Sequence, residues 1–137
     1  MGQFLLSGDY EQFALCTYPK LLSMVGGKEK MVAILSETVN NMKEQGMTFS
    51  KVSFEEPSKI FKSGIEMQCM LMQHTEIKLR QGRVISTSTL IAISTNNGKD
   101  WTFVDTSNKD MSTIRKLLPH LNNEITIPPQ QPPLQLN

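Results

Sequence analysis

Six ionisable side chains are candidates for acid–base chemistry: Tyr10, Tyr18, Glu66, His74, Glu76 and Asp105. A histidine held in a pocket beside a carboxylate can take and return a proton, as isomerases and dehydratases require. A single histidine on a strand is nevertheless more often an exposed or hydrogen-bonded residue. The second histidine, His120, directly follows Pro119 and is expected at the surface. The sequence therefore favours a function without catalysis, with acid–base catalysis as the alternative.

The two cysteines, Cys16 and Cys69, lie far apart, with no CxxC pair and no cluster of Cys and His. This spacing argues against a zinc site and against a redox-active pair. The sequence contains no phosphate-binding loop either, so neither a metal nor a cofactor is predicted. We expect two free thiols, because isolated cysteines in apolar surroundings are usually buried and unpaired. A disulfide between them would instead favour an exported protein.

Charge and hydropathy exclude two classes of partner. The chain has 14 Lys and Arg against 13 Asp and Glu, with both signs interspersed, so neither nucleic acid nor an anionic membrane surface is expected. No apolar run approaches the roughly 18 residues of a membrane-spanning helix, which predicts a soluble protein. Phe4, Leu5 and Leu6 resemble the last turn of a helix that begins upstream, so an export signal outside this chain stays an alternative.

Residues 3–45 predict the elements that must position any site. Gln3–Ser7 reads as a helical turn that Gly8 and Asp9 interrupt, and a helix follows with apolar residues at spacings of three to four. Pro19 suits the first turn of a new short helix. The longest helix is expected from Lys28 to Gln45, with Gly46 as its left-handed cap.

From Met47 onward the apolar period changes to two, which predicts strands. Met47–Phe54 is expected to contain a bulge between Phe49 and Val52, because its inward phase shifts there. Long strands are predicted at 65–80 and 83–95, joined by a two-residue turn at Gln81-Gly82 that would pair Gln73 with Leu90. A hairpin through Asn97-Gly98 leads to a last strand at 100–106, and a short helix is expected at 110–118.

Both faces of the predicted sheet are apolar at their centre. Met67, Cys69, Leu71, Leu90, Ala92, Trp101 and Phe103 share one face, and Met70, Met72, Ile91, Ile93 and Val104 share the other. An antiparallel sheet with one solvated face would alternate apolar with polar residues. The second face therefore needs a cover, which a partner subunit, the tail or a ligand could supply. A homodimer through the sheet is our first expectation.

The end of the chain changes composition. Pro128-Pro129-Gln130-Gln131-Pro132-Pro133 is typical of polyproline, either as a ligand of an aromatic-grooved domain or, by preference, as a solvated terminus. We therefore expect one domain over residues 1–127, followed by a Pro/Gln-rich tail at 128–137. Helices first and strands afterwards indicate an α+β fold, with N-terminal helices packed on a curved antiparallel meander and a short C-terminal helix.

The segment from Phe4 to Phe13, followed by Tyr18-Pro19, resembles the opening of NTF2-like proteins of cystatin-like fold, where a first helix breaks at a Gly-Asp pair. The segments Thr17–Met31 and Thr89–Thr106 are similar to small bacterial members of this group. The resemblance implies a cone-shaped cavity between helices and sheet, and often a dimer. Isomerases, dehydratases and binding modules share the fold, so it does not select a function. The acid, base and oxyanion-binding positions of the isomerases have no match here.

We therefore predict a non-catalytic domain that binds a small apolar molecule or a protein. The predicted pocket residues are Tyr10, Phe13, Tyr18, Leu71, His74, Leu90, Phe103 and Asp105. One alternative is an isomerase or dehydratase that uses a pocket histidine and carboxylate. The other is a dimeric structural or interaction module, in which some of the nine methionines fill the cavity.

Overall fold

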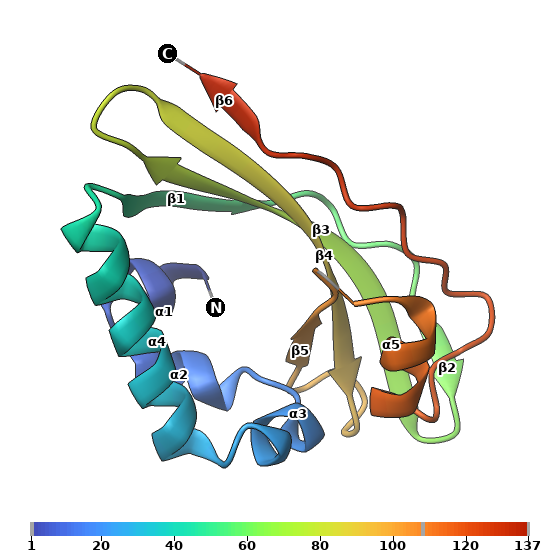
Figure 1. The fold of residues 1–137 in the computed structure, drawn as a ribbon. Coiled ribbons are helices and arrows are strands. Elements are labelled where there is room, and N and C mark those ends of the chain that lie inside the picture. The colour runs from blue at the N-terminus through green and yellow to red at the C-terminus, as the bar shows by residue number, and fades with distance from the viewer. Residues whose placement is uncertain (1, 108, 137) are drawn as a thin grey trace.

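A computed structural model describes residues 2–107 and 109–136 of the chain. It has an α+β architecture, with four helices before the sheet and one after most of it (Figure 1). The helices α1, α2 and α4 lie on one side of the sheet, and α5 lies on the other side (Figure 1). The short helix α3 lies near the edge strand β5 (Thr102–Asp105), where Lys20 Nζ donates to the Lys116 carbonyl of α5 at 3.1 Å. The predicted segregation of helices and strands is confirmed.

The four N-terminal helices begin and end close to the predicted positions. They are α1 (Gly2–Ser7), α2 (Tyr10–Leu15), α3 (Pro19–Met24) and α4 (Lys28–Glu44). Asp9 caps α2 by accepting a hydrogen bond from the Gln12 backbone N–H at 3.3 Å. Gly46 follows α4 with a φ of 81°, the left-handed conformation predicted for it.

The strands form one open antiparallel sheet of six strands in the order β1-β3-β4-β5, with β2 beside β3 and β6 beside β4. Their bounds are β1 (Thr48–Phe54), β2 (Phe61–Ser63), β3 (Glu66–Lys78), β4 (Arg83–Ser94), β5 (Thr102–Asp105) and β6 (Leu134–Leu136). The register of β1 on β3 shifts between Phe49 and Lys51, which confirms the predicted bulge. Asn97 and Gly98 have φ values of 61° and 82°, as the predicted hairpin turn requires.

The pairing of β3 with β4 differs from the prediction by two residues. Gln73 lies opposite Ser88, and Leu90 lies opposite Leu71. The predicted two-residue turn was wrong, because β3 ends at Lys78 and β4 begins at Arg83, which leaves four residues in the connection. An even shift keeps every side chain on its predicted face, so only the cross-strand partners change.

We call the side of the sheet toward α1, α2 and α4 the N-terminal face and the opposite side the C-terminal face. The helices contact the sheet mainly at two of its edges. Beside β5, the Tyr18 backbone N–H donates to the Phe103 carbonyl at 3.0 Å, and the Phe103 N–H donates to the Cys16 carbonyl at 2.8 Å. At the other edge α1 lies against β1. Both cysteines are free thiols, as predicted.

The C-terminal face is covered by α5 (Met111–Leu117) and by the segment that follows it. Side chains of the sheet, α5 and residues 118–125 form one buried cluster: Phe61, Ile91, Ile93, Val104, Ile114, Leu117, Leu118, Leu121 and Ile125. The chain itself therefore covers the apolar face for which we expected a partner subunit. The argument for a homodimer at this face no longer holds.

A buried glutamine holds the segment after α5 against β3. The Gln68 amide Nε2 donates to the His120 carbonyl at 2.9 Å and to Glu66 Oε1 at 3.0 Å. Gln68 Oε1 accepts a hydrogen bond from the Asn122 backbone N–H at 2.9 Å. Because Gln68 is completely buried, these bonds compensate for the loss of its hydration.

The end of the chain returns along the sheet to β4 (Figure 1). Residues 128–133 are exposed, as expected of a solvated terminus, but β6 pairs with β4 over Arg83–Ile85. This pairing was not predicted. It occurs because β5 contacts only residues 90–93 of β4, which leaves the first part of that strand as an edge with free backbone groups.

Candidate functional site

A mainly apolar cavity lies between the four N-terminal helices and the N-terminal face of the sheet. Its volume is about 420 Å³, and it is partly open to solvent. This volume lies within the range of small-molecule sites, roughly 300–1,000 Å³. We call it the helix–sheet cavity.

Side chains from nearly every N-terminal element line the helix–sheet cavity. The helical wall is mainly apolar and consists of Leu5, Phe13, Thr17, Leu21, Met31, Leu35, Thr38 and Val39. The wall on the sheet side consists of Phe49, Val52, Gln73, Thr75, Ile77, Ser86, Ser88, Leu90, Phe103, Asp105 and Ser107. Because both walls come from elements far apart in sequence, the cavity depends on the tertiary fold.

The wall on the sheet side has a polar centre bordered by apolar residues, and at one end the Asp105 carboxylate lies opposite Leu90. Gln73 lies opposite Ser88, and Thr75 lies opposite Ser86, so two cross-strand pairs place four polar side chains together. Ile77 and Phe49 border this group at one end, and Leu90 and Phe103 border it at the other. We call Gln73, Thr75, Ser86 and Ser88 the polar band.

Part of the hydrogen-bonding capacity of the polar band is unused. Gln73 Nε2 donates to Thr75 Oγ1 at 3.3 Å. The hydroxyls of Ser86 and Ser88 have no hydrogen-bond partner among the residues that the structure describes. These hydroxyls border open space, and none of the described buried polar side-chain atoms is left unsatisfied. The band can therefore hydrogen-bond a molecule in the cavity.

Asp105 is the only charged residue among the described residues that line the helix–sheet cavity. It is exposed at the end of β5, and its Oδ1 accepts a hydrogen bond from the Ser107 backbone N–H at 2.9 Å. A carboxylate in this position can bind a hydrogen-bond donor at the rim. It disfavours an anionic ligand, since no lining residue carries a compensating positive charge.

The structure brings together four of the eight predicted pocket residues, Phe13, Leu90, Phe103 and Asp105. Leu71 lies on the N-terminal face but outside the lining. Tyr10 lines a separate, smaller space between α1, α4 and β1. Tyr18 packs against the buried cluster of the C-terminal face, where burial, and next the charge of Glu66, raises the pKa of its hydroxyl. These three predicted residues are therefore not part of the lining of the helix–sheet cavity.

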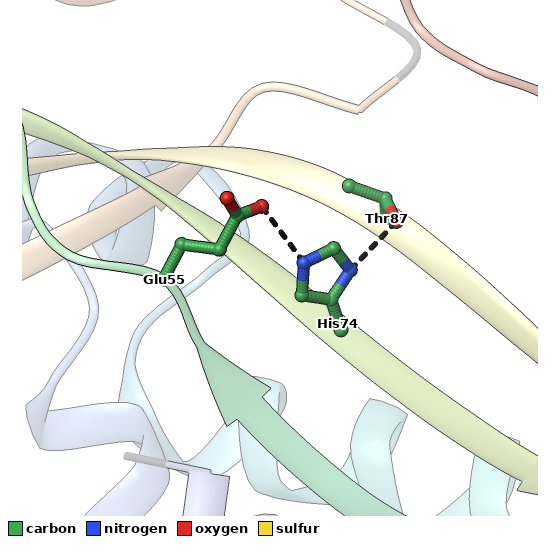
Figure 2. A network of polar contacts seen from close by, with 3 residues as sticks. All are labelled: Glu55, His74 and Thr87. Carbon is green, nitrogen blue, oxygen red and sulfur yellow. Dashed lines mark hydrogen bonds and ion pairs between the residues drawn. The ribbon is translucent and has the colours of Figure 1, made fainter.

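His74 was also predicted in the pocket, but it lies on the C-terminal face. Its Nε2 is 2.8 Å from Glu55 Oε2, and its Nδ1 is 2.8 Å from Thr87 Oγ1. Figure 2 shows the imidazole bridging the carboxylate and the hydroxyl. In this chain a carboxylate, an imidazole and a hydroxyl thus form a short hydrogen-bonded row across three segments of the chain.

The surroundings of His74 favour a structural role over proton transfer. The side chains of His74 and Glu55 are 33% and 53% exposed, so bulk water competes with any substrate at the row. Thr87 sits in the middle of β4, directly opposite His74. The row attaches residue 55, just beyond the end of β1, to the two central strands. The proposed pocket pair of a histidine and a carboxylate is not assembled.

A second space lies on the C-terminal face, between the sheet, α5 and residues 127–131. Its volume is about 370 Å³, and its lining includes Met72, Thr87, Lys109, Asp110 and Ile127. It is formed where the returning chain crosses the sheet. The sequence analysis did not predict it, because the path of residues 128–133 has no periodic signal.

Several lining residues of the helix–sheet cavity escaped sequence reasoning. Gln73, Thr75, Ser86 and Ser88 were not predicted as pocket residues, although their period of two places them on the same face as Leu71 and Leu90. The shift of two residues in the predicted register hid their pairing. Met31, Leu35 and Val39 recur at helical spacing in α4, but they were not predicted as pocket residues either.

No group of described residues could hold a metal ion. None of the described helices is long and apolar enough to cross a bilayer. No protein-family model matches the sequence, and neither a curated protein nor a solved structure matches it significantly. The function must therefore be argued from the cavity.

Proposed function

We propose that the chain is a non-catalytic binding domain, whose ligand is a small and mainly apolar molecule in the helix–sheet cavity. The observation that carries this proposal is the packing of α4. None of the 17 residues of α4 is buried, although Met31, Leu35 and Val39 line the cavity against the sheet. A helix of this length normally buries its apolar stripe in the core.

The empty space under α4 is costly for a domain of this size. Protein interiors are close-packed, and each unfilled volume loses dispersion contacts that a larger side chain would provide. The lining nevertheless contains small residues such as Ser86 and Ser88, where larger apolar residues would fill the space. A ligand that replaces the missing contacts explains this choice of residues.

Binding is favoured over catalysis by the distribution of ionisable groups. Proton transfer requires an acid or base beside the reacting atom, and a second group commonly orients it. Of the residues described along the cavity, only Asp105 is charged, and it lies at the exposed rim. His74 and Glu55 lie on the other face of the sheet.

The resemblance to NTF2-like proteins supports the same proposal. In that group helices and a curved antiparallel sheet enclose a cone-shaped cavity, and the order of elements in this chain agrees with such an arrangement. We accordingly propose that residues 1–127 form an NTF2-like domain. A homodimer is not needed to complete the helix–sheet cavity, since its lining comes from one chain.

The proposal is tested by binding of prodan, an uncharged naphthyl ketone whose fluorescence reports an apolar environment. We expect saturable blue-shifted emission and an increase in melting temperature with prodan concentration. Saturation at one hundred times the dissociation constant stabilises the native state by about 2.7 kcal/mol. The matched variant is Ser88→Ile, which fills the cavity, and the control is Thr87→Val on the other face of the same strand.

Loss of binding in Ser88→Ile, with binding retained in Thr87→Val, would support the proposal. Prodan emission that does not saturate, or that is equal in both variants, would contradict it. A folded Ser88→Ile variant is required for this comparison. Unchanged far-ultraviolet circular dichroism and a cooperative melting transition establish that it is folded.

A further inference from the structure

We infer that the ligand of the helix–sheet cavity is uncharged and carries its hydrogen-bonding group near its middle, between two apolar arms. This inference rests on the proposed function and specifies the chemical class of the ligand. An ester, an amide or a ketone with an alkyl group on each side has this character. The arrangement of the polar band carries the argument.

The first step is the position of the polar band. Its two cross-strand pairs occupy the centre of the wall on the sheet side, with Ile77 toward one end and Leu90 toward the other, where Asp105 lies opposite Leu90 at the exposed rim. Along a strand, residues of one face are about 6.6 Å apart, so the four side chains cover about one polar functional group. A ligand with its polar group at one terminus would place an alkyl chain against this band and leave its hydroxyls unpaired.

The second step concerns the donors. The hydroxyls of Ser86 and Ser88 are without a hydrogen-bond partner in the part of the chain that the structure describes. Either hydroxyl can donate to a carbonyl oxygen of a ligand. Thr17, on the helical wall, already uses its hydroxyl against the Met31 sulfur at 3.4 Å. The Thr38 hydroxyl, also on the helical wall, has no described hydrogen-bond partner either. On the sheet side, the two free hydroxyls of Ser86 and Ser88 lie close to each other.

The third step is charge. Among the lining residues described, there is no lysine, arginine or histidine, and the one charged group is the Asp105 carboxylate. An anion in the cavity would lose hydration without gaining a cationic partner. The large majority of the lining is apolar or carries a neutral hydroxyl or amide. A neutral molecule can hydrogen-bond to the polar band without the cost of removing a charge from water.

Three isomeric probes separate these features. Pentyl pentanoate has a central ester, methyl nonanoate has a terminal ester, and the third isomer, decanoic acid, is ionised to decanoate at neutral pH. Their dissociation constants are measured by displacement of prodan from the wild-type chain. We expect pentyl pentanoate to bind about tenfold more tightly than methyl nonanoate, because one or two additional hydrogen bonds are formed. Decanoate is expected to bind the least tightly.

The variant Ser86→Ala/Ser88→Ala removes both donors and leaves the apolar ends unchanged. We expect it to reduce the preference for pentyl pentanoate over methyl nonanoate to about twofold or less. Thr87→Val removes a hydroxyl from the same strand on the opposite face and should keep the full preference. A preference that persists in the double alanine variant would overturn the assignment to the polar band.

The outcomes distinguish the two proposals. If neither prodan nor any of the three isomers binds, the proposed function fails, and the inference about the ligand fails with it. If all three isomers bind equally, the cavity binds ligands but the inference about their class is overturned. Tightest binding of decanoate would also overturn it, since a charged ligand would then be preferred.

Discussion

The two faces of the sheet are covered by the same chain in opposite ways. On the C-terminal face, α5 and residues 118–125 bury their side chains against Ile91, Ile93 and Val104. On the N-terminal face, α4 has no buried residue and stands over a cavity of about 420 Å³. The chain can therefore pack a sheet face closely, and its loose packing on the other face is a local property.

The difference indicates a division of roles. The C-terminal face supplies most of the fully buried apolar side chains, so it is expected to supply most of the stability. On the N-terminal face, the helices contact the sheet along its edges, and the cavity lies over the centre of the face. Because the packed C-terminal face stabilises the fold, the domain can tolerate a cavity on the N-terminal face. Such a cavity is suited to binding a ligand.

The largest expected effect comes from truncating the packed face. Ile114→Ala removes a completely buried side chain of α5 and should lower the free energy of unfolding by about 2–5 kcal/mol. Leu35→Ala is the matched change on α4. It borders the existing cavity and improves helix propensity, so we expect a loss within about 1 kcal/mol. Urea denaturation measures both, and equal losses would remove the contrast between the faces.

Enlarging side chains should give the opposite contrast. Ile93→Phe overpacks the C-terminal face, where Ile93 is 2% exposed, and should cost about 1–3 kcal/mol. Ser88→Ile adds apolar volume in the cavity and should leave the stability unchanged or raise it by up to about 1 kcal/mol. Chemical denaturation of the two variants tests the comparison. A destabilised but folded Ser88→Ile would mean that this face has no room.

The connection from α4 to β1 tests whether backbone conformation places α4. Gly46 has a φ of 81°, and a Cβ atom there would meet the Arg80 side chain. Gly46→Ala should cost about 1–2 kcal/mol, because an L-residue is strained in this conformation. Gly46→Asn is the control, since asparagine tolerates the left-handed region better. An equal cost for both would assign the effect to Arg80, and no cost for Ala would contradict the account.

The smallest expected effect concerns the pH dependence of the packed face. Hydrogen bonds from Thr113, first from its backbone N–H, lower the pKa of the Asp110 carboxyl below its ordinary value of 3.8. The folded state therefore favours the carboxylate, and this contribution to stability is present above pH 3.8. It is lost as the pH falls through the lowered pKa.

Asp110→Asn keeps a capping oxygen without a titrating group, so it isolates this effect. The wild-type chain should lose stability relative to Asp110→Asn only at the acid end of a series from pH 7 to pH 2. Urea denaturation at each pH measures the difference. A difference that changes between pH 7 and pH 5 would assign the titration to another group.

Much of the fold was predictable because its helix ends and turns depend on local backbone preferences. Asp9 and Gly46 mark helix boundaries through their own backbone preferences, and Asn97-Gly98 marks a turn in the same way. The bulge after Phe49 was visible as a change of phase. The pairing of Gln73 with Ser88 was not predictable in this way, since the length of the connection at 79–82 determines it.

The candidate site was predictable only in part. Phe13, Leu90 and Phe103 follow from the apolar period of their elements, and the structure places them in the cavity. His74 was assigned to the pocket by its chemistry, although its position in β3 puts it on the face of Met70. The C-terminal face is covered because residues 118–127 run across it. No periodic pattern in the sequence predicts the course of this segment.

The most direct test of the account is the location of a bound probe. Pentyl pentanoate is titrated into isotope-labelled protein, and backbone amide resonances are followed by NMR. We predict saturable shifts at residues 73–77 and 86–90 and in α4, with little change in α5. Shifts confined to α5 and residues 127–131 would place the probe in the other space and contradict the account. An absence of saturable shifts would contradict it as well.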